Sequence, residues 1–310
     1  MAKSKKFTDE YVSINGILQY FLHIQNVSKD VIIMLHGGPG IPNSYLAYYH
    51  QPYLDFCNVV YYDQRGAGKT QLKNKSKPES LSLDILLEDL KQTIRYLKHK
   101  YQTNRIFLAG HSWGTVLGTQ YIIKYPQDIV GYIGYGQCVD MATSDRSWYK
   151  HLKRAVLKSG KRSHIKNINS VNAAYPQVNC EEFVKATLFL SRLESKYSYK
   201  ANNFTKIYRK SPIMTFRAGM QIGGAEKFNQ KLLKDVLHGY DIRSIKEYQV
   251  PIYYILGRYD EWTTSTVAAE YFNTIQAPNK KLYWIEEAGH ATDTDNPSAF
   301  FKAIKEIIIQ

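Results

Sequence analysis

The chain has 310 residues, of which 41 are Lys or Arg and 27 are Asp or Glu, so its formal net charge is +14 at pH 7. This length fits one large domain or two small ones, and the 44% of hydrophobic residues exclude a disordered chain. No run of 18 apolar residues occurs, and the basic start has no apolar stretch behind it. We therefore expect neither a membrane span nor a signal peptide, and predict a soluble, cytoplasmic protein.

Three cysteines, Cys57, Cys138 and Cys180, lie far apart in the sequence. Their spacing is not that of metal ligands, and an odd number makes a disulfide framework a poor interpretation. We predict that all three are reduced, buried thiols and that the chain holds no metal.

The first half of the chain alternates between strand and helix patterns. Asn15-Gly16 is a strong hairpin signal, which predicts an antiparallel edge formed by segments 11–14 and 18–24. Apolar residues recur at helical spacing between Ser82, a candidate N-cap, and Tyr101. Continuous apolar runs typical of buried parallel strands occur at 31–35, 59–62 and 106–109.

The pattern changes after a further strand candidate at 129–135. Residues 139–250 contain no continuous apolar strand run and are predicted to form helices and loops. Strand and helix patterns then resume at 252–256, 267–272 and 281–285, and a last helix begins at Asn296-Pro297. These patterns predict an α/β fold with a mostly parallel sheet flanked by helices, built from residues 1–138 and 251–310 and interrupted by a helical cap at 139–250.

The positive charge lies mainly on this predicted cap. Residues 139–250 contain 21 Lys or Arg and 9 Asp or Glu, a net charge of about +12, which leaves about +2 for the rest of the chain. Within them, residues 146–166 carry eight basic residues and no acidic one. Such a surface favours anionic ligands over cationic ones, or it is a solvated face that keeps the protein soluble. Neither a specific nucleic acid nor a membrane partner is expected, and the sequence does not fix the oligomeric state.

The strongest chemical signal is Gly110-His111-Ser112-Trp113-Gly114, which follows the strand ending at Ala109 and precedes a helical stretch. In this context the serine lies on a sharp turn that presents its hydroxyl above the edge of the sheet. The glycines let the backbone pass close to its neighbours. We predict that Ser112 is a nucleophile.

A serine hydroxyl needs a base to activate it, and the base needs an acid to orient it. Asp260 and His290 follow Ser112 in the usual order, each on a loop just after a predicted strand, where open α/β sheets place their sites. The oxyanion would accept hydrogen bonds from the backbone N–H groups of Trp113 and Gly38, the latter in the loop after the strand at 31–35.

Several motifs together carry a family resemblance: His36-Gly37-Gly38-Pro39-Gly40, Asp63-Gln64-Arg65-Gly66, Ser112-Trp113-Gly114, Gly257-Arg258-Tyr259-Asp260 and Gly289-His290. In this order the chain resembles the proline iminopeptidases, which are α/β hydrolases. The resemblance implies a catalytic triad of Ser112, Asp260 and His290, an oxyanion hole at Gly38 and Trp113, a structural role for Arg65, and no cofactor. A phosphate-binding loop at Gly66-Ala67-Gly68-Lys69-Thr70 is discounted, because position 63 is Asp rather than the required Gly.

The resemblance is weaker where substrate is selected. The chain has Gly110-His111 where family members usually have Gly-Gly. The family binds the free amino terminus of its substrate through glutamates of the cap. The resemblance therefore implies that Glu194 is a candidate for this role, with Glu181-Glu182 as a second possibility. The alternative is that Glu194 is an ordinary solvated glutamate on a helix. The expected activity is an aminopeptidase acting on small molecules or short peptides. The alternatives are a carboxylesterase acting on small, anionic esters and a non-catalytic receptor or anion-binding scaffold.

Overall fold

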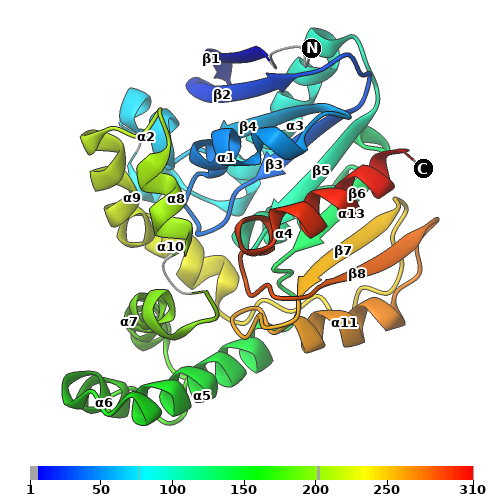
Figure 1. Cartoon of the computed structure of the whole chain (residues 1–310). Helices are drawn as coiled ribbons and strands as arrows, with labels where there is room; N and C mark the ends of the chain where they lie inside the picture. Colours follow the sequence, from blue (N-terminus) through cyan, green and yellow to red (C-terminus); the bar gives the residue numbers. More distant parts are fainter. Residues whose placement is uncertain (1–5, 76, 201–202, 310) are drawn as a thin grey trace.

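Eight strands form one mixed sheet in a computed structural model that describes residues 6–75, 77–200 and 203–309 (Figure 1). The strand order is β1-β2-β4-β3-β5-β6-β7-β8. β1 pairs antiparallel with β2 and β2 with β4, whereas every other neighbouring pair is parallel. The strands are β1 (Lys6–Ile14), β2 (Ile17–Gln25), β3 (Val31–Leu35), β4 (Asn58–Asp63), β5 (Ile106–His111), β6 (Gly131–Tyr135), β7 (Ile252–Gly257) and β8 (Lys280–Ile285).

The hairpin and the parallel strands confirm the sequence predictions. Asn15 and Gly16 both have positive φ values, 45° and 77°, as a tight hairpin turn requires. All residues of β3 and β4 are buried, which explains why these strands are continuous apolar runs. Residues 1–5, on which the predicted absence of a signal peptide partly rests, lie outside the described residues.

Helices cover both faces of the sheet, and alternate strand residues supply two apolar clusters. Ile33 of β3 belongs to one cluster with residues of α3 (Leu83–Tyr101), α4 (Trp113–Lys124) and α11 (Ser265–Thr274). Ile32 belongs to the other, with residues of α1 (Ala47–His50) and α13 (Pro297–Ile309). Ser82 caps α3, since its Oγ accepts a hydrogen bond from the Ile85 N–H at 3.3 Å.

Between β6 and β7 the described residues form helices and no named strand, as the sequence predicts. Figure 1 shows this segment to one side of the sheet. It comprises α5 (Met141–Ser159), α6 (Arg162–Asn169), α7 (Cys180–Tyr197), α8 (Asn203–Lys210), α9 (Phe216–Phe228), α10 (Gln230–Leu232) and a π-helical turn, η5 (Leu233–Leu237). The division of the chain into a core and a cap domain at residues 139 and 250 stays a prediction.

Short helices in the loops were not predicted. They are η1 (Asn43–Leu46), η2 (Gln51–Tyr53), α2 (Gly68–Asn74), η3 (Pro78–Ser80), η4 (Pro126–Asp128) and α12 (Thr292–Asp295).

The prediction for the cysteines is wrong at one position, because Cys180 at the start of α7 is only partly buried. In the described part of the chain, no helix is both long and apolar enough to cross a membrane.

Candidate active site

Ser112 lies on a strained turn between β5 and α4. Its backbone angles are φ 52° and ψ −119°, a conformation that costs a residue with a side chain about 1–3 kcal/mol. A Cβ atom on Gly114 would lie 2.2 Å from the Leu35 carbonyl oxygen, and one on Gly110 would lie 2.5 Å from the Gly114 carbonyl oxygen. The two glycines therefore allow α4 to approach β3 closely enough to form this turn.

Asp260 and His290 are brought together from the loops after β7 and β8. The Nδ1 atom of His290 lies 3.0 Å from Oδ2 of Asp260. Three further donors hold the carboxylate: the N–H groups of Trp262 and Thr263 at 2.9 and 3.1 Å, and the Thr263 hydroxyl at 2.8 Å. Because the carboxylate accepts from Nδ1, the Nε2 atom of neutral His290 is left free to take a proton.

The electrostatics of this pair favour the charged forms. Burial alone would raise the pKa of Asp260, but the charge and hydrogen bond of His290 lower it below its usual value. Burial alone would lower the pKa of His290, but the Asp260 charge and hydrogen bond outweigh it and raise that pKa above 6.5. The arrangement thus stabilises an imidazolium at position 290.

The proposed oxyanion donors lie on two loops that Gln64 connects. Gly38 has φ 112°, and a Cβ atom there would lie 2.7 Å from the Gly40 nitrogen. Trp113 is the first residue of α4, so its N–H has no acceptor inside the helix. The Gln64 backbone N–H donates to Nε2 of His36 at 3.0 Å, and its side-chain Oε1 accepts from the Trp113 indole at 3.2 Å. Gln64 was not singled out as a site residue in the sequence.

A cavity of about 280 Å³ brings the predicted residues to one place. Ser112, His290, Gly38 and Glu194 all line it, while Asp260 lies behind His290. Its wall is formed by Gly37, Gly38, Ile41, Asn43, Leu46, His111, Ser112, Ser191, Glu194, Ser195, Ser198, Tyr199, Lys200, Phe204, Thr205, Tyr208, Ile222, Tyr259, Trp262, His290, Ala291 and Asp295.

Glu194 is a buried carboxylate in the wall of this cavity. It lies on α7 and is 8% exposed, and its Oε2 atom accepts a hydrogen bond from the Trp148 indole at 2.7 Å. Burial raises its pKa above the usual value of 4.5, despite the Trp148 bond and the positive charge of His290. The second possibility, Glu181-Glu182, begins α7 about 18 Å along the helix, on the rise per residue, and does not line the cavity.

His111 contacts the His290 loop. Its Nε2 atom lies 3.0 Å from the His290 carbonyl oxygen, so Nε2 carries the proton, and burial lowers the pKa of His111 to about 3. His111 also stacks on Tyr135, with ring centroids 4.8 Å apart. The departure from Gly-Gly at this position was the only signal in the sequence for this contact.

Arg65 has a structural role, as the resemblance implied. Its guanidinium donates two hydrogen bonds to buried Asp89, at 2.8 and 2.9 Å, and a third to the Asn15 carbonyl. The start of α2 does not form a phosphate cradle, because the Lys69 N–H donates to Asp63 and the Gly68 N–H donates to Gln221.

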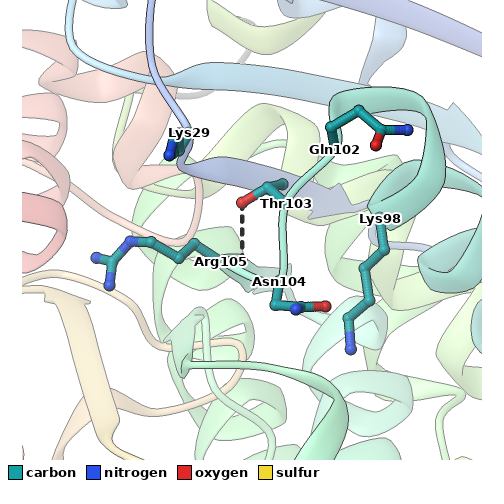
Figure 2. A pocket seen from close by; sticks show the side chains of 6 residues that line it. All are labelled: Lys29, Lys98, Gln102, Thr103, Asn104 and Arg105. Atoms are coloured by element: carbon teal, nitrogen blue, oxygen red, sulfur yellow. Dashed lines mark hydrogen bonds between the residues drawn. The ribbon is translucent and has the colours of Figure 1, made fainter.

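A second hollow, of about 480 Å³, is lined by six residues, which Figure 2 shows from close by. Its residues come before β3 and β5 or from the end of α3, so it lies at the amino ends of the parallel strands. The wall is basic, but Arg105 pairs with Asp30 and Lys98 lies 3.8 Å from Asp128. Sites of open α/β sheets lie at the carboxyl ends instead, so this hollow is a poor candidate for the active site.

Among the described residues no group of three or more His, Cys, Asp or Glu could hold a metal ion.

Known proteins similar to this chain support the same class of fold. A family model described as serine aminopeptidase, S33, matches residues 27–296. Probable aminopeptidase YbaC of Bacillus subtilis (strain 168) is 25% identical over 305 residues, which cover 94% of this chain and 91% of that protein. Proline iminopeptidase of Heyndrickxia coagulans is 23% identical over 312 residues, or 97% and 99% of the two chains. The crystal structure of proline iminopeptidase from Mycobacterium smegmatis superposes with a TM-score of 0.72 at 16% identity, covering 98% of each chain.

The sheet, its helices and these matches define the protein as an α/β hydrolase. The chain belongs to the S33 serine aminopeptidase family. The fold class predicted from the sequence and the resemblance to proline iminopeptidases are both confirmed.

Proposed function

We propose that this S33 hydrolase is an aminopeptidase that releases the N-terminal residue of short peptides, as a proline iminopeptidase does. The observation that carries the proposal is that one cavity is lined by Ser112, on its strained turn, by His290, hydrogen-bonded to Asp260, and by the buried carboxylate of Glu194. The proposal is supported by the relatives in Bacillus subtilis and Heyndrickxia coagulans, which are named as a probable aminopeptidase and a proline iminopeptidase.

The proposed mechanism is attack by the Ser112 hydroxyl on the carbonyl carbon of the substrate. His290 takes the hydroxyl proton at Nε2, and Asp260 holds the opposite ring nitrogen and stabilises the imidazolium. The N–H groups of Gly38 and Trp113 would bind the oxyanion. His290 then gives its proton to the leaving amine, and water hydrolyses the acyl-enzyme by the reverse sequence. No step requires a cofactor or a metal.

Glu194 would bind the substrate's ammonium group. A carboxylate accepts about four hydrogen bonds, so the bonds from Trp148 and Ser198 leave capacity for an ammonium donor. An ionised carboxylate in this wall attracts a cationic ligand and offsets the charge of Lys200, which lines the same cavity. The carboxylesterase alternative would be favoured by a cavity without such a carboxylate.

Covalent labelling tests the nucleophile. A fluorophosphonate should label the purified protein at Ser112, and Ser112→Ala should abolish labelling without changing the melting temperature. A folded wild-type protein that takes up no label would contradict the enzyme proposal and favour the receptor or scaffold alternative.

Hydrolysis of aminoacyl arylamides, their N-acetylated forms and short-chain aryl esters tests the substrate class. We expect turnover of free-amine arylamides. Glu194→Gln should raise KM for them by about 10- to 100-fold, the value of a hydrogen bond to a charged group, with little change for esters. The Gln side chain still accepts from Trp148, and Glu181→Gln at the exposed start of the same helix is the matched control. Turnover of esters alone would favour the carboxylesterase.

A further inference from the structure

Asn43 is a buried polar residue in the wall of the active-site cavity. It is only 4% exposed, yet neither Nδ2 nor Oδ1 of its carboxamide has a hydrogen-bond partner among the described residues. About 90% or more of buried polar groups in proteins are hydrogen-bonded, and an unpaired one lowers stability. A residue that lowers stability and lines a ligand cavity is a candidate for ligand recognition.

Hydrogen bonds hold the residues on both sides of Asn43 in place. Asn43 begins η1, three residues after the loop that carries Gly38. On one side of it, the Pro42 carbonyl accepts a hydrogen bond from the Tyr208 hydroxyl. On the other, the Ser44 hydroxyl donates to Oδ1 of buried Asp63 at 2.7 Å. The backbone is therefore fixed on both sides of Asn43, which is itself a lining residue of the cavity.

The surroundings of Asn43 are apolar. The neighbouring wall is formed by side chains of the η1 region and of helices α8 and α9, among them Ile41, Leu46, Phe204 and Ile222. Glu194 lies on a different helix, α7, together with Ser191 and Ser195, which line the same cavity. The cavity thus has a polar wall that carries Glu194 and a mostly apolar wall that carries Asn43, and Asp295 is a second carboxylate in its lining.

The chemistry of the carboxamide selects its partner. Its Nδ2 donates and its Oδ1 accepts, so the complementary ligand group has one acceptor and one donor side by side, as a peptide group has. In the proposed reaction Glu194 binds the amino end and the scissile carbonyl lies in the oxyanion hole. The first peptide group left for Asn43 is therefore the one that follows the scissile bond.

We propose that Asn43 is a specificity-determining residue that hydrogen-bonds the peptide group after the scissile bond. This rests on the proposed aminopeptidase function and extends it, because it makes the enzyme favour peptides of three or more residues. A substrate that replaces this peptide N–H by an ester oxygen leaves Oδ1 without a donor, and sites built to hydrogen-bond a group discriminate against analogues that lack it.

The experiment compares three substrates that share one N-terminal residue: an arylamide, a tripeptide, and the tripeptide analogue with an ester in place of the second peptide bond. We expect the wild type to prefer the tripeptide to its ester analogue in kcat/KM. Asn43→Leu should lower kcat/KM for the tripeptide by about tenfold or more relative to its effect on the arylamide, and should abolish the preference for the tripeptide over its ester analogue.

Thermal unfolding provides the matched control. Asn43→Leu removes two unpaired buried atoms, so its melting temperature should equal or exceed that of the wild type. Asn229 is equally buried, but its Nδ2 donates to the Ala225 carbonyl at 2.8 Å and to the Gly66 carbonyl at 3.4 Å. Asn229→Leu should therefore lower the melting temperature. If Asn43→Leu does not fold, Asn43→Ala serves for the same comparison.

The outcomes separate the two proposals. Equal losses for arylamide and tripeptide, or a preference for the tripeptide that survives in Asn43→Leu, would overturn the role of Asn43 and leave the aminopeptidase proposal standing. A wild type that hydrolyses neither arylamide nor tripeptide, but does hydrolyse aryl esters, would overturn the aminopeptidase proposal and the inference that rests on it.

Discussion

The charge state of His290 is controlled by the residues packed around it. The Asp260 carboxylate raises the pKa of His290, and burial acts in the opposite direction. In the proposed mechanism only neutral His290 can accept the proton of Ser112. We therefore expect kcat/KM to fall as pH decreases through a pKa above 6.5.

Asp260→Asn tests this balance. Without the Asp260 charge, burial dominates, so the pKa of His290 should fall and the acidic limb of the pH–rate profile should move to lower pH. The rate on the plateau should drop by about 10⁴-fold, since the amide no longer fixes the tautomer. Full pH profiles of kcat/KM for both proteins measure this, with circular dichroism as the control for folding. An unmoved acidic limb would contradict the assignment of Asp260.

For single residues, the sequence identifies a site residue when the residue belongs to a motif that follows a predicted strand. Ser112, Asp260 and His290 each end a strand pattern, so their convergence at the carboxyl edge of the sheet could be predicted. Asn43 and His111 could not, because their significance depends on contacts made or missing across the fold. Asn43 has no partner within the described residues, and His111 reaches the carbonyl of a residue far along the chain.

Among the elements, the contact between α4 and β3 leaves no space at Gly114. A Cβ there would meet backbone atoms of Leu35, which cannot move without shifting the strand. Gly114→Ala should therefore destabilise the protein by about 1–3 kcal/mol and reduce activity with it. Gly223 is the matched control: it is exposed in the middle of α9, and a Cβ there would meet nothing within 4 Å.

Gly223→Ala should instead stabilise the protein, by about 0.5–1 kcal/mol, because alanine restricts the unfolded chain and favours the helix. Chemical unfolding of both variants measures the two free energies. A Gly114→Ala protein as stable as Gly223→Ala would show that α4 does not need this close approach.

The strands and long helices could be predicted because their patterns are complete within the element. Short helices could not. α2 begins after Ala67, which makes no side-chain cap. Its first turn is instead held by Asp63: the carboxylate accepts a hydrogen bond from the Lys69 N–H at 2.7 Å, and the backbone carbonyl accepts one from the Thr70 hydroxyl at 2.6 Å. Such tertiary contacts replace the local signals on which sequence prediction depends.

For the whole molecule, most of the positive charge lies outside the cavity wall. The basic residues of α5 and α6 do not line it, whereas Lys200 does. Lys150, Arg154 and Lys158 are exposed at successive i, i+4 positions of α5, where like charges repel. At physiological salt the Debye length is about 8 Å, so exposed charges beyond that distance have little effect on a ligand.

Replacing Lys150, Arg154 and Lys158 by Gln should thus leave kcat/KM within about twofold at physiological salt, for neutral and acidic substrates alike. The same variant should elute from a cation exchanger at lower salt. A loss of fivefold or more for acidic substrates alone would show that this surface selects substrates, the interpretation that the sequence left open.

The position of β7 and β8 at one edge of the sheet also sets when activity can arise during synthesis. The Gly38 loop and the Ser112 turn are made by the first 114 residues, whereas Asp260 and His290 follow the last two strands. A chain cut short before β8 would hold Ser112 without the base that the proposed mechanism requires. The proposed activity would therefore arise only after β8 and the loop that carries His290 have been made.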